Sequence, residues 1–78
     1  MASTTTHPGE VLRELLVERE ISQRELSSII QIAHSHLHNI LSGDRTISPE
    51  IAVRLEAAGL ETAIYWLQLQ INHQLDLR

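Results

Sequence analysis

The stretch from Ser22 to Gly43, SQRELSSIIQIAHSHLHNILSG, predicts a pair of short helices, because it contains a helix start, a tight break and a second amphipathic segment. Ser22 and Glu25 have the spacing of a capping box, in which each side chain satisfies a free backbone N–H of the other residue. This spacing predicts a short helix that begins at Gln23. Its apolar side ends at about Ile30, and a further helix then runs to the glycine that closes the stretch.

The second helix of this stretch, over about residues 33–41, has one apolar side and one polar side. Leu37, Ile40 and Leu41 recur at helical spacing and are predicted to face the core. The polar residues predicted to point outward are His34, Ser35, His38 and Asn39. Two short helices joined by a tight turn, with polar residues on the outer side of the second, can place a helix in the DNA major groove. Short helix pairs also occur in proteins that never touch DNA, so a protein-binding module is an alternative.

Further helix signals lie on both sides of this pair. Pro8 suits the first turn of a helix, where its missing N–H is not needed. Ser48 precedes a proline and predicts the start of another helix, which stops at Gly59. Thr62 can cap a last helix over about residues 62–77. No strand pattern or internal repeat competes, so the sequence predicts an all-α fold of five helices.

Length and composition fit one small domain. The chain has 78 residues, which predicts a single domain over residues 7–78 after a flexible tail at residues 1–6. It contains no cysteine, which excludes disulfide and thiolate chemistry. Its first residues lack the basic segment and apolar run of an export signal, and no stretch is long enough to cross a membrane. We therefore expect a cytoplasmic protein that makes no membrane contact.

The last predicted helix has apolar residues on two sides, so it has two surfaces that need a packing partner. A chain of this size buries only roughly 60% of its unfolded surface when it folds alone. A second copy would add apolar contact, and we expect a homodimer with this helix at or just behind the contact. The candidate dimerisation residues are Ile64, Trp66, Leu67, Leu69 and Ile71.

The net charge of -4 argues against unspecific coating of nucleic acid, which depends on Lys and Arg that neutralise phosphates. The distribution of charge weakens this objection, because the middle of the chain is neutral. There, Arg24 and Arg45 offset Glu25 and Asp44. Binding of DNA through the middle of the chain thus remains compatible with an acidic protein.

The sequence contains no convincing metal or catalytic site. His34, His36 and His38 alternate, but in a helix the middle residue points away from the other two. At most two imidazoles could therefore bind one ion, and no carboxylate or Cys lies at a matching offset. The Ser residues fall mainly at predicted helix caps and the Glu residues on solvated faces, which leaves no hydrolase arrangement. We expect no metal, no cofactor and no enzymatic activity.

From His7 to Leu77 the chain resembles the HigA-type antitoxins of the Xre helix-turn-helix superfamily. The matching segments are, in order, HPGEVLRELL, ISQREL, ILSGDRTISPEIAVRLE and YWLQLQ. Their spacing across one chain makes the resemblance specific. Three positions depart from the family pattern: Gln31 replaces a usual Gly, Ala33 replaces a capping Ser or Thr, and Asp44 replaces a usual Lys or Arg.

The resemblance implies a lambda-repressor-like domain with a positioning helix at about 23–30, a recognition helix at about 33–41 and a C-terminal dimerisation helix. The implied base-reading residues are His34, Ser35, His38 and Asn39. The implied phosphate-binding residues are Gln23, Arg24, Ser42 and Arg45. The implied function is that of an antitoxin, which represses its own operon through a double-stranded DNA operator and neutralises a small RelE-like ribonuclease toxin. The alternative is a stand-alone or phage-type transcriptional regulator without a toxin.

Overall fold

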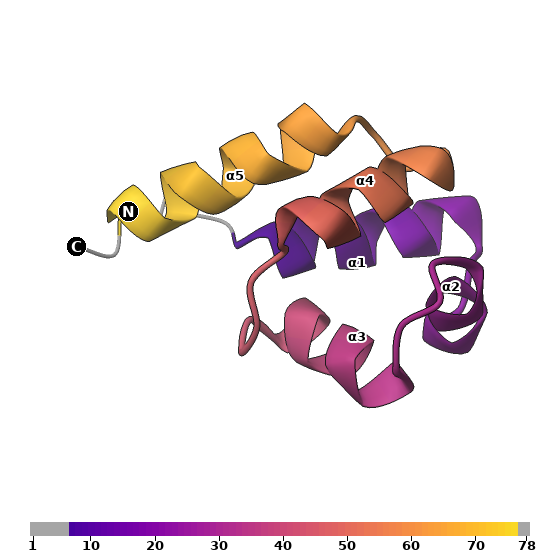
Figure 1. Ribbon diagram of the computed structural model, residues 1–78. Coiled ribbons are helices and arrows are strands. Elements are labelled where there is room, and N and C mark those ends of the chain that lie inside the picture. The colour runs from indigo at the N-terminus through magenta and orange to yellow at the C-terminus, as the bar shows by residue number, and fades with distance from the viewer. Residues whose placement is uncertain (1–6, 77–78) are drawn as a thin grey trace.

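Five helices make up the computed structural model, which describes residues 7–76, and no strand lies within that range (Figure 1). The helices are α1 (Pro8–Arg19), α2 (Gln23–Ile29), α3 (His34–Ser42), α4 (Pro49–Ala57) and α5 (Ala63–Asp76). The predicted all-α fold of five helices is confirmed. The tail predicted at residues 1–6 lies outside the described residues.

The arrangement places α1 between α3 on one side and α5 on the other (Figure 1). α4 packs on α5, and α2 packs on α3. A glycine in the first turn of α1 permits its approach to α3, because a Cβ added at Gly9 would collide with the carbonyl oxygen of Ile40. Arg13, one turn later, donates a hydrogen bond from Nη2 to the carbonyl oxygen of Leu41 at 3.2 Å. One flank of α1 is thereby fixed against α3.

Local signals set the ends of the helices. The Oγ of Ser22 accepts the N–H of Glu25 at 3.0 Å, and the Oε1 of Glu25 accepts the N–H of Ser22 at 2.8 Å, so the predicted capping box is present. Ser48 and Thr62 each accept the backbone N–H of the third residue after them, at 3.3 and 3.1 Å. Gly43 ends α3 in the left-handed region, with φ of 93°.

The core joins all five helices and the loops between them. Trp66 exposes 0% of its surface, and its Nε1–H donates to the carbonyl oxygen of Leu60 at 2.6 Å. The sequence predicts this residue at or just behind a dimer contact. Because its side chain is fully buried, it can lie only behind such a contact. The buried apolar residues are Leu12, Leu16, Leu26, Ile30, Leu37, Ile40, Leu41, Ile47, Ile51, Ala52, Leu55, Leu60 and Trp66.

One buried polar contact attaches α5 to the loop before α4. The Oε1 of Gln70, on the inner side of α5, accepts the N–H of Ile47 at 2.9 Å. Both groups are buried, so each would lose hydrogen bonding without the other. This contact supports the loop that follows α3.

The turn between α2 and α3 contains a residue in an unfavourable backbone conformation. Gln31 has φ of 58°, which lies in the left-handed region. There the Cβ of an L-residue approaches the following carbonyl oxygen, at a cost of roughly 1–2 kcal/mol. A glycine, the usual residue here in the family that the sequence resembles, would avoid this cost.

Gln31→Gly is expected to raise the free energy of unfolding by about 0.5–1 kcal/mol, because the relief of the Cβ contact exceeds the added freedom of the unfolded chain. Urea unfolding followed by Trp66 fluorescence measures this change. Gln31→Ala is the matched control, since it removes the same side chain but keeps the Cβ and should give no gain. A gain of equal size in both variants, or a loss with glycine, contradicts the argument.

Candidate nucleic-acid interface

α3 presents a polar side to solvent while its apolar side enters the core. Its buried residues are Leu37, Ile40 and Leu41. Of the four base-reading candidates, His34, Ser35 and His38 are exposed, and Asn39 is half-buried at the edge of the same side. All four therefore lie on one helix and around one surface, and Asn39 is the least accessible of them.

The four phosphate-binding candidates lie at two helix ends. Gln23 and Arg24 occupy the first turn of α2, with Gln23 half-buried and Arg24 exposed. Ser42 ends α3, and Arg45 is exposed in the loop that follows. Within residues 7–76 neither Arg24 nor Arg45 forms an ion pair, so both guanidinium groups are available to an external anion.

Asn39 also fixes the loop that carries one of these arginines. Its backbone carbonyl oxygen accepts the N–H of Asp44 at 2.8 Å and the N–H of Arg45 at 3.1 Å. The hydroxyl of Ser42 lies 3.1 Å from the same oxygen and 3.2 Å from Oδ2 of Asp44. The structure thus connects a candidate for base reading with a candidate for phosphate binding through the backbone.

The carboxylate of Asp44 lies directly after the C-terminal end of α3. It stands where the resembling family usually has a cation, and it accepts the Ser42 hydroxyl rather than pairing with Arg45. Since Arg45 retains an unpaired charge beside it, the two side chains nearly cancel in their effect on a distant phosphate. The affinity of this end of the interface for a phosphate then depends on direct hydrogen bonds and ion pairs with that phosphate.

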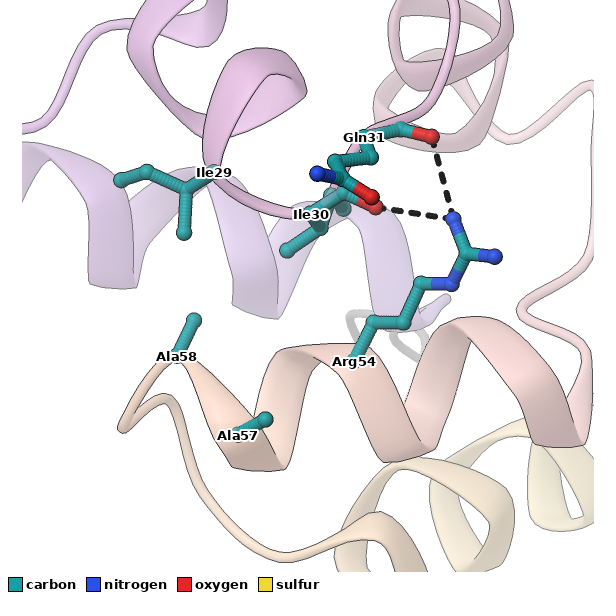
Figure 2. Close-up of a pocket in the computed structure, with 6 residues that line it drawn as sticks. All are labelled: Ile29, Ile30, Gln31, Arg54, Ala57 and Ala58. Atoms are coloured by element: carbon teal, nitrogen blue, oxygen red, sulfur yellow. Dashed lines mark hydrogen bonds between the residues drawn. The ribbon is translucent and has the colours of Figure 1, made fainter.

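The turn before α3 is held from outside by Arg54 of α4, a residue that the sequence reading did not select. Its Nη1 donates to the carbonyl oxygens of Ile30 and Gln31, both at 3.0 Å, and Figure 2 shows the guanidinium pointing toward these oxygens. Its Nη2 donates to Oε2 of Glu50 at 2.7 Å. The pair Glu50 and Arg54 has the helical i, i+4 spacing that a sequence shows, but the carbonyl contacts span 23 and 24 residues and leave no local signal.

This contact compensates for a missing cap. Ala33 precedes α3 and makes no side-chain cap hydrogen bond, so the start of α3 lacks the local fixation that Ser22 gives α2. The carbonyls of Ile30 and Gln31 directly follow the last turn of α2, and a cation is favourable at such a helix end. Arg54 therefore fixes the end of α2 and, through the turn, the direction in which α3 begins.

The described residues show no sign of a metal site or of a membrane span. Within residues 7–76 no three His, Cys, Asp or Glu side chains gather as metal ligands would. In the same range no helix has both the length and the apolar character needed to cross a bilayer. The outer side of α3 with the two neighbouring helix ends is the surface that the predicted site residues define.

Comparison with known proteins finds the same fold. The helix-turn-helix family model matches residues 12–59, from α1 to just past α4. The helix-turn-helix-type transcriptional regulator YddM of Escherichia coli strain K12, itself described as uncharacterized, is 33% identical over 63 residues, which are 81% of this chain and 67% of that protein.

Two solved structures have closely similar folds. One is the antitoxin HigA of Pseudomonas aeruginosa with the higBA promoter, with a TM-score of 0.88 and 32% identity over 94% of this chain and 80% of that chain. The other is an addiction module antidote protein of the HigA family from Coxiella burnetii, with a TM-score of 0.86 and 30% identity over 96% of this chain and 83% of that chain. Nearly the whole described chain therefore takes part in the likeness.

Arg54→Met is expected to lower the free energy of unfolding by about 1–3 kcal/mol, because the part-buried carbonyl of Ile30 loses its charged donor while the aliphatic stem is retained. Glu50→Gln is the control: it weakens an exposed ion pair, worth about 0–1 kcal/mol, and leaves both carbonyl contacts intact. Urea unfolding of both variants measures the difference. If Arg54→Met costs no more than Glu50→Gln, Arg54 does not hold the turn.

Proposed function

This chain belongs to the helix-turn-helix family, its structural neighbours include HigA-type antitoxins, and from this we propose that it is a DNA-binding antitoxin of the cytoplasm. It represses its own operon by binding an operator, and it neutralises a small RelE-like ribonuclease toxin by direct contact. The observation that carries the proposal is the agreement of the whole five-helix arrangement with an antitoxin that was solved on its promoter.

In the proposed complex α3 enters the major groove, which is wide enough for a helix. His34, Ser35, His38 and Asn39 then face the base edges. Gln23, Arg24, Ser42 and Arg45 contact phosphates from the start of α2 and from just beyond α3. The division follows from position, since contacts from the ends of the helix pair reach the backbone and contacts from the outer side of α3 reach the bases.

A homodimer would bring two recognition helices to successive major grooves, about 34 Å apart. α5 offers a surface for it, because Ile64, Ile71 and Leu75 expose 74%, 52% and 52% of their surface along one side of this helix. Leu67 is half-buried on the flank of this side, whereas Leu69 is half-buried and lies toward the other side of the helix. We place Ile64, Leu67 and Ile71 at the proposed contact, with Leu69 and Trp66 behind it.

A stand-alone transcriptional regulator is the second candidate, favoured by the similarity to YddM, which is described as a regulator. An antitoxin requires a toxin partner, whereas a stand-alone regulator does not. Expression of a small basic protein encoded beside this chain is expected to arrest growth, and co-expression of this chain is expected to restore growth and to co-purify with that protein. Growth arrest that this chain does not relieve, or the absence of such a neighbouring frame, supports the stand-alone regulator.

Asn39→Ala is expected to weaken binding to the operator by about 1–3 kcal/mol and to relax base selection at one position, because asparagine can make a bidentate contact with adenine. Fluorescence anisotropy with a duplex from upstream of the gene and with a scrambled duplex measures both effects. An equal loss on the two duplexes contradicts base reading by Asn39.

Arg45→Ala provides the comparison for this experiment. It is expected to weaken binding to both duplexes alike and to reduce the slope of log affinity against log salt by about 1, because one phosphate contact fewer releases fewer counterions. If both variants bind the operator as the natural chain does, α3 is not the recognition helix and the protein-binding alternative gains support.

A further inference from the structure

A groove of about 320 Å³ lies between α1 and the first turns of α5. Its apolar lining includes Val11 and Leu15, which are half-buried, together with Val17 and Tyr65, which expose 74% and 37% of their surface. Covering such an exposed valine by a partner removes apolar surface from water, which favours binding. None of the residues assigned to DNA or to the dimer contact lines this groove.

Acidic residues surround the apolar lining. Glu14, Glu18 and Glu61 line the groove and are exposed, and within residues 7–76 none of them forms an ion pair. Glu14 and Glu18 follow each other at i, i+4 on α1, and Glu10 extends this row by one more turn. Like charges at this spacing oppose the helix, so the row costs stability in the free protein.

Within residues 7–76 the arginines of α1 form no ion pair with these carboxylates. Arg13 donates to the carbonyl oxygen of Leu41 on α3, and Arg19 donates to the carbonyl oxygen of Gly59 at 3.1 Å. Both cations of the helix are therefore directed to backbone oxygens. The lining of the groove itself holds three carboxylates and no Lys or Arg, and this excess of negative charge favours a basic surface.

The negative charge and the apolar surface of the groove together favour some binding partners over others. DNA and anionic lipid would be repelled by the carboxylates. A second copy docked symmetrically on this groove would place its own Glu14, Glu18 and Glu61 against the same residues, because a two-fold interface pairs identical patches. A protein with apolar side chains ringed by Lys and Arg matches the groove in both respects.

We propose that the groove between α1 and α5 is the docking surface for a basic partner protein. The inference rests on the proposed antitoxin function and assigns the surface through which the toxin is held. The partner's cations meet Glu14, Glu18 and Glu61, and its apolar side chains cover Val17 and Tyr65. Because Gly9 and Arg13 face α3 from the opposite flank of α1, the outer side of α3 stays open and the partner and DNA can bind together.

The test uses the full chain and the small basic protein encoded beside it, with affinities measured by isothermal titration calorimetry. The double variant Val17→Ser/Glu18→Lys changes only exposed side chains of the groove. It is expected to weaken binding of the basic protein by about tenfold or more and to reduce the salt dependence of that binding. Its affinity for the operator duplex is expected to stay within about twofold of the natural value, because both substitutions lie off the DNA surface.

The control is Val53→Ser/Asp44→Lys, which also replaces a valine by serine and a carboxylate by lysine at exposed positions, but outside the groove; it is compared only for binding of the basic protein, because Asp44 lies beside the proposed DNA contacts. It is expected to bind the basic protein as the natural chain does. Equal binding by the groove variant overturns the assignment of the surface while the antitoxin function stands. Failure of the natural chain to bind the basic protein overturns both, and a groove variant that changes from dimer to monomer in sedimentation identifies the groove as a self-contact instead.

Discussion

The hydrogen bonds from Arg54 to the turn between α2 and α3 are the interaction on which the proposed DNA-reading surface depends. A recognition helix functions only if its direction relative to the positioning helix is fixed, and here two usual local devices, a glycine in the turn and a capping side chain before α3, are missing. The turn has Gln31 at a positive φ where glycine is easier, and α3 starts at an alanine that cannot cap it. A guanidinium from α4 supplies the fixation instead, from outside the helix pair.

The sequence predicts those features of the fold whose causes lie within a few residues. The caps at Ser22, Ser48 and Thr62 each involve a partner three residues away, so pattern and structure agree. The contacts of Arg54 and Gln70 join residues 23 or 24 positions apart, and nothing in the local pattern marks them. The sequence predicts Trp66 at or just behind a dimer contact and does not decide between the two, because helical spacing shows that a residue shares a side with other apolar residues, not which element covers it.

The charge distribution of the protein can likewise be predicted only in part from the sequence. The sequence shows that the acidic excess falls outside the middle of the chain, and this is enough to reconcile a net charge of -4 with DNA binding. The acidic groove cannot be predicted from the sequence alone. Glu14 and Glu18 of α1 line the same groove as Glu61 only because α5 packs beside α1. The molecule thereby separates three surfaces: a polar side of α3, an apolar side of α5 and an acidic groove on the far flank of α1.

The most direct test of the central claim, that α3 with the neighbouring helix ends contacts DNA, is a titration of the ¹⁵N-labelled protein with a duplex from upstream of its gene. Amide resonances followed by NMR report each residue separately. We expect the largest shifts in α3, in the first turn of α2 and in the loop of Arg45, and little change at the residues of the α1–α5 groove. Shifts concentrated in α1 and α5, with α3 unchanged, would contradict it.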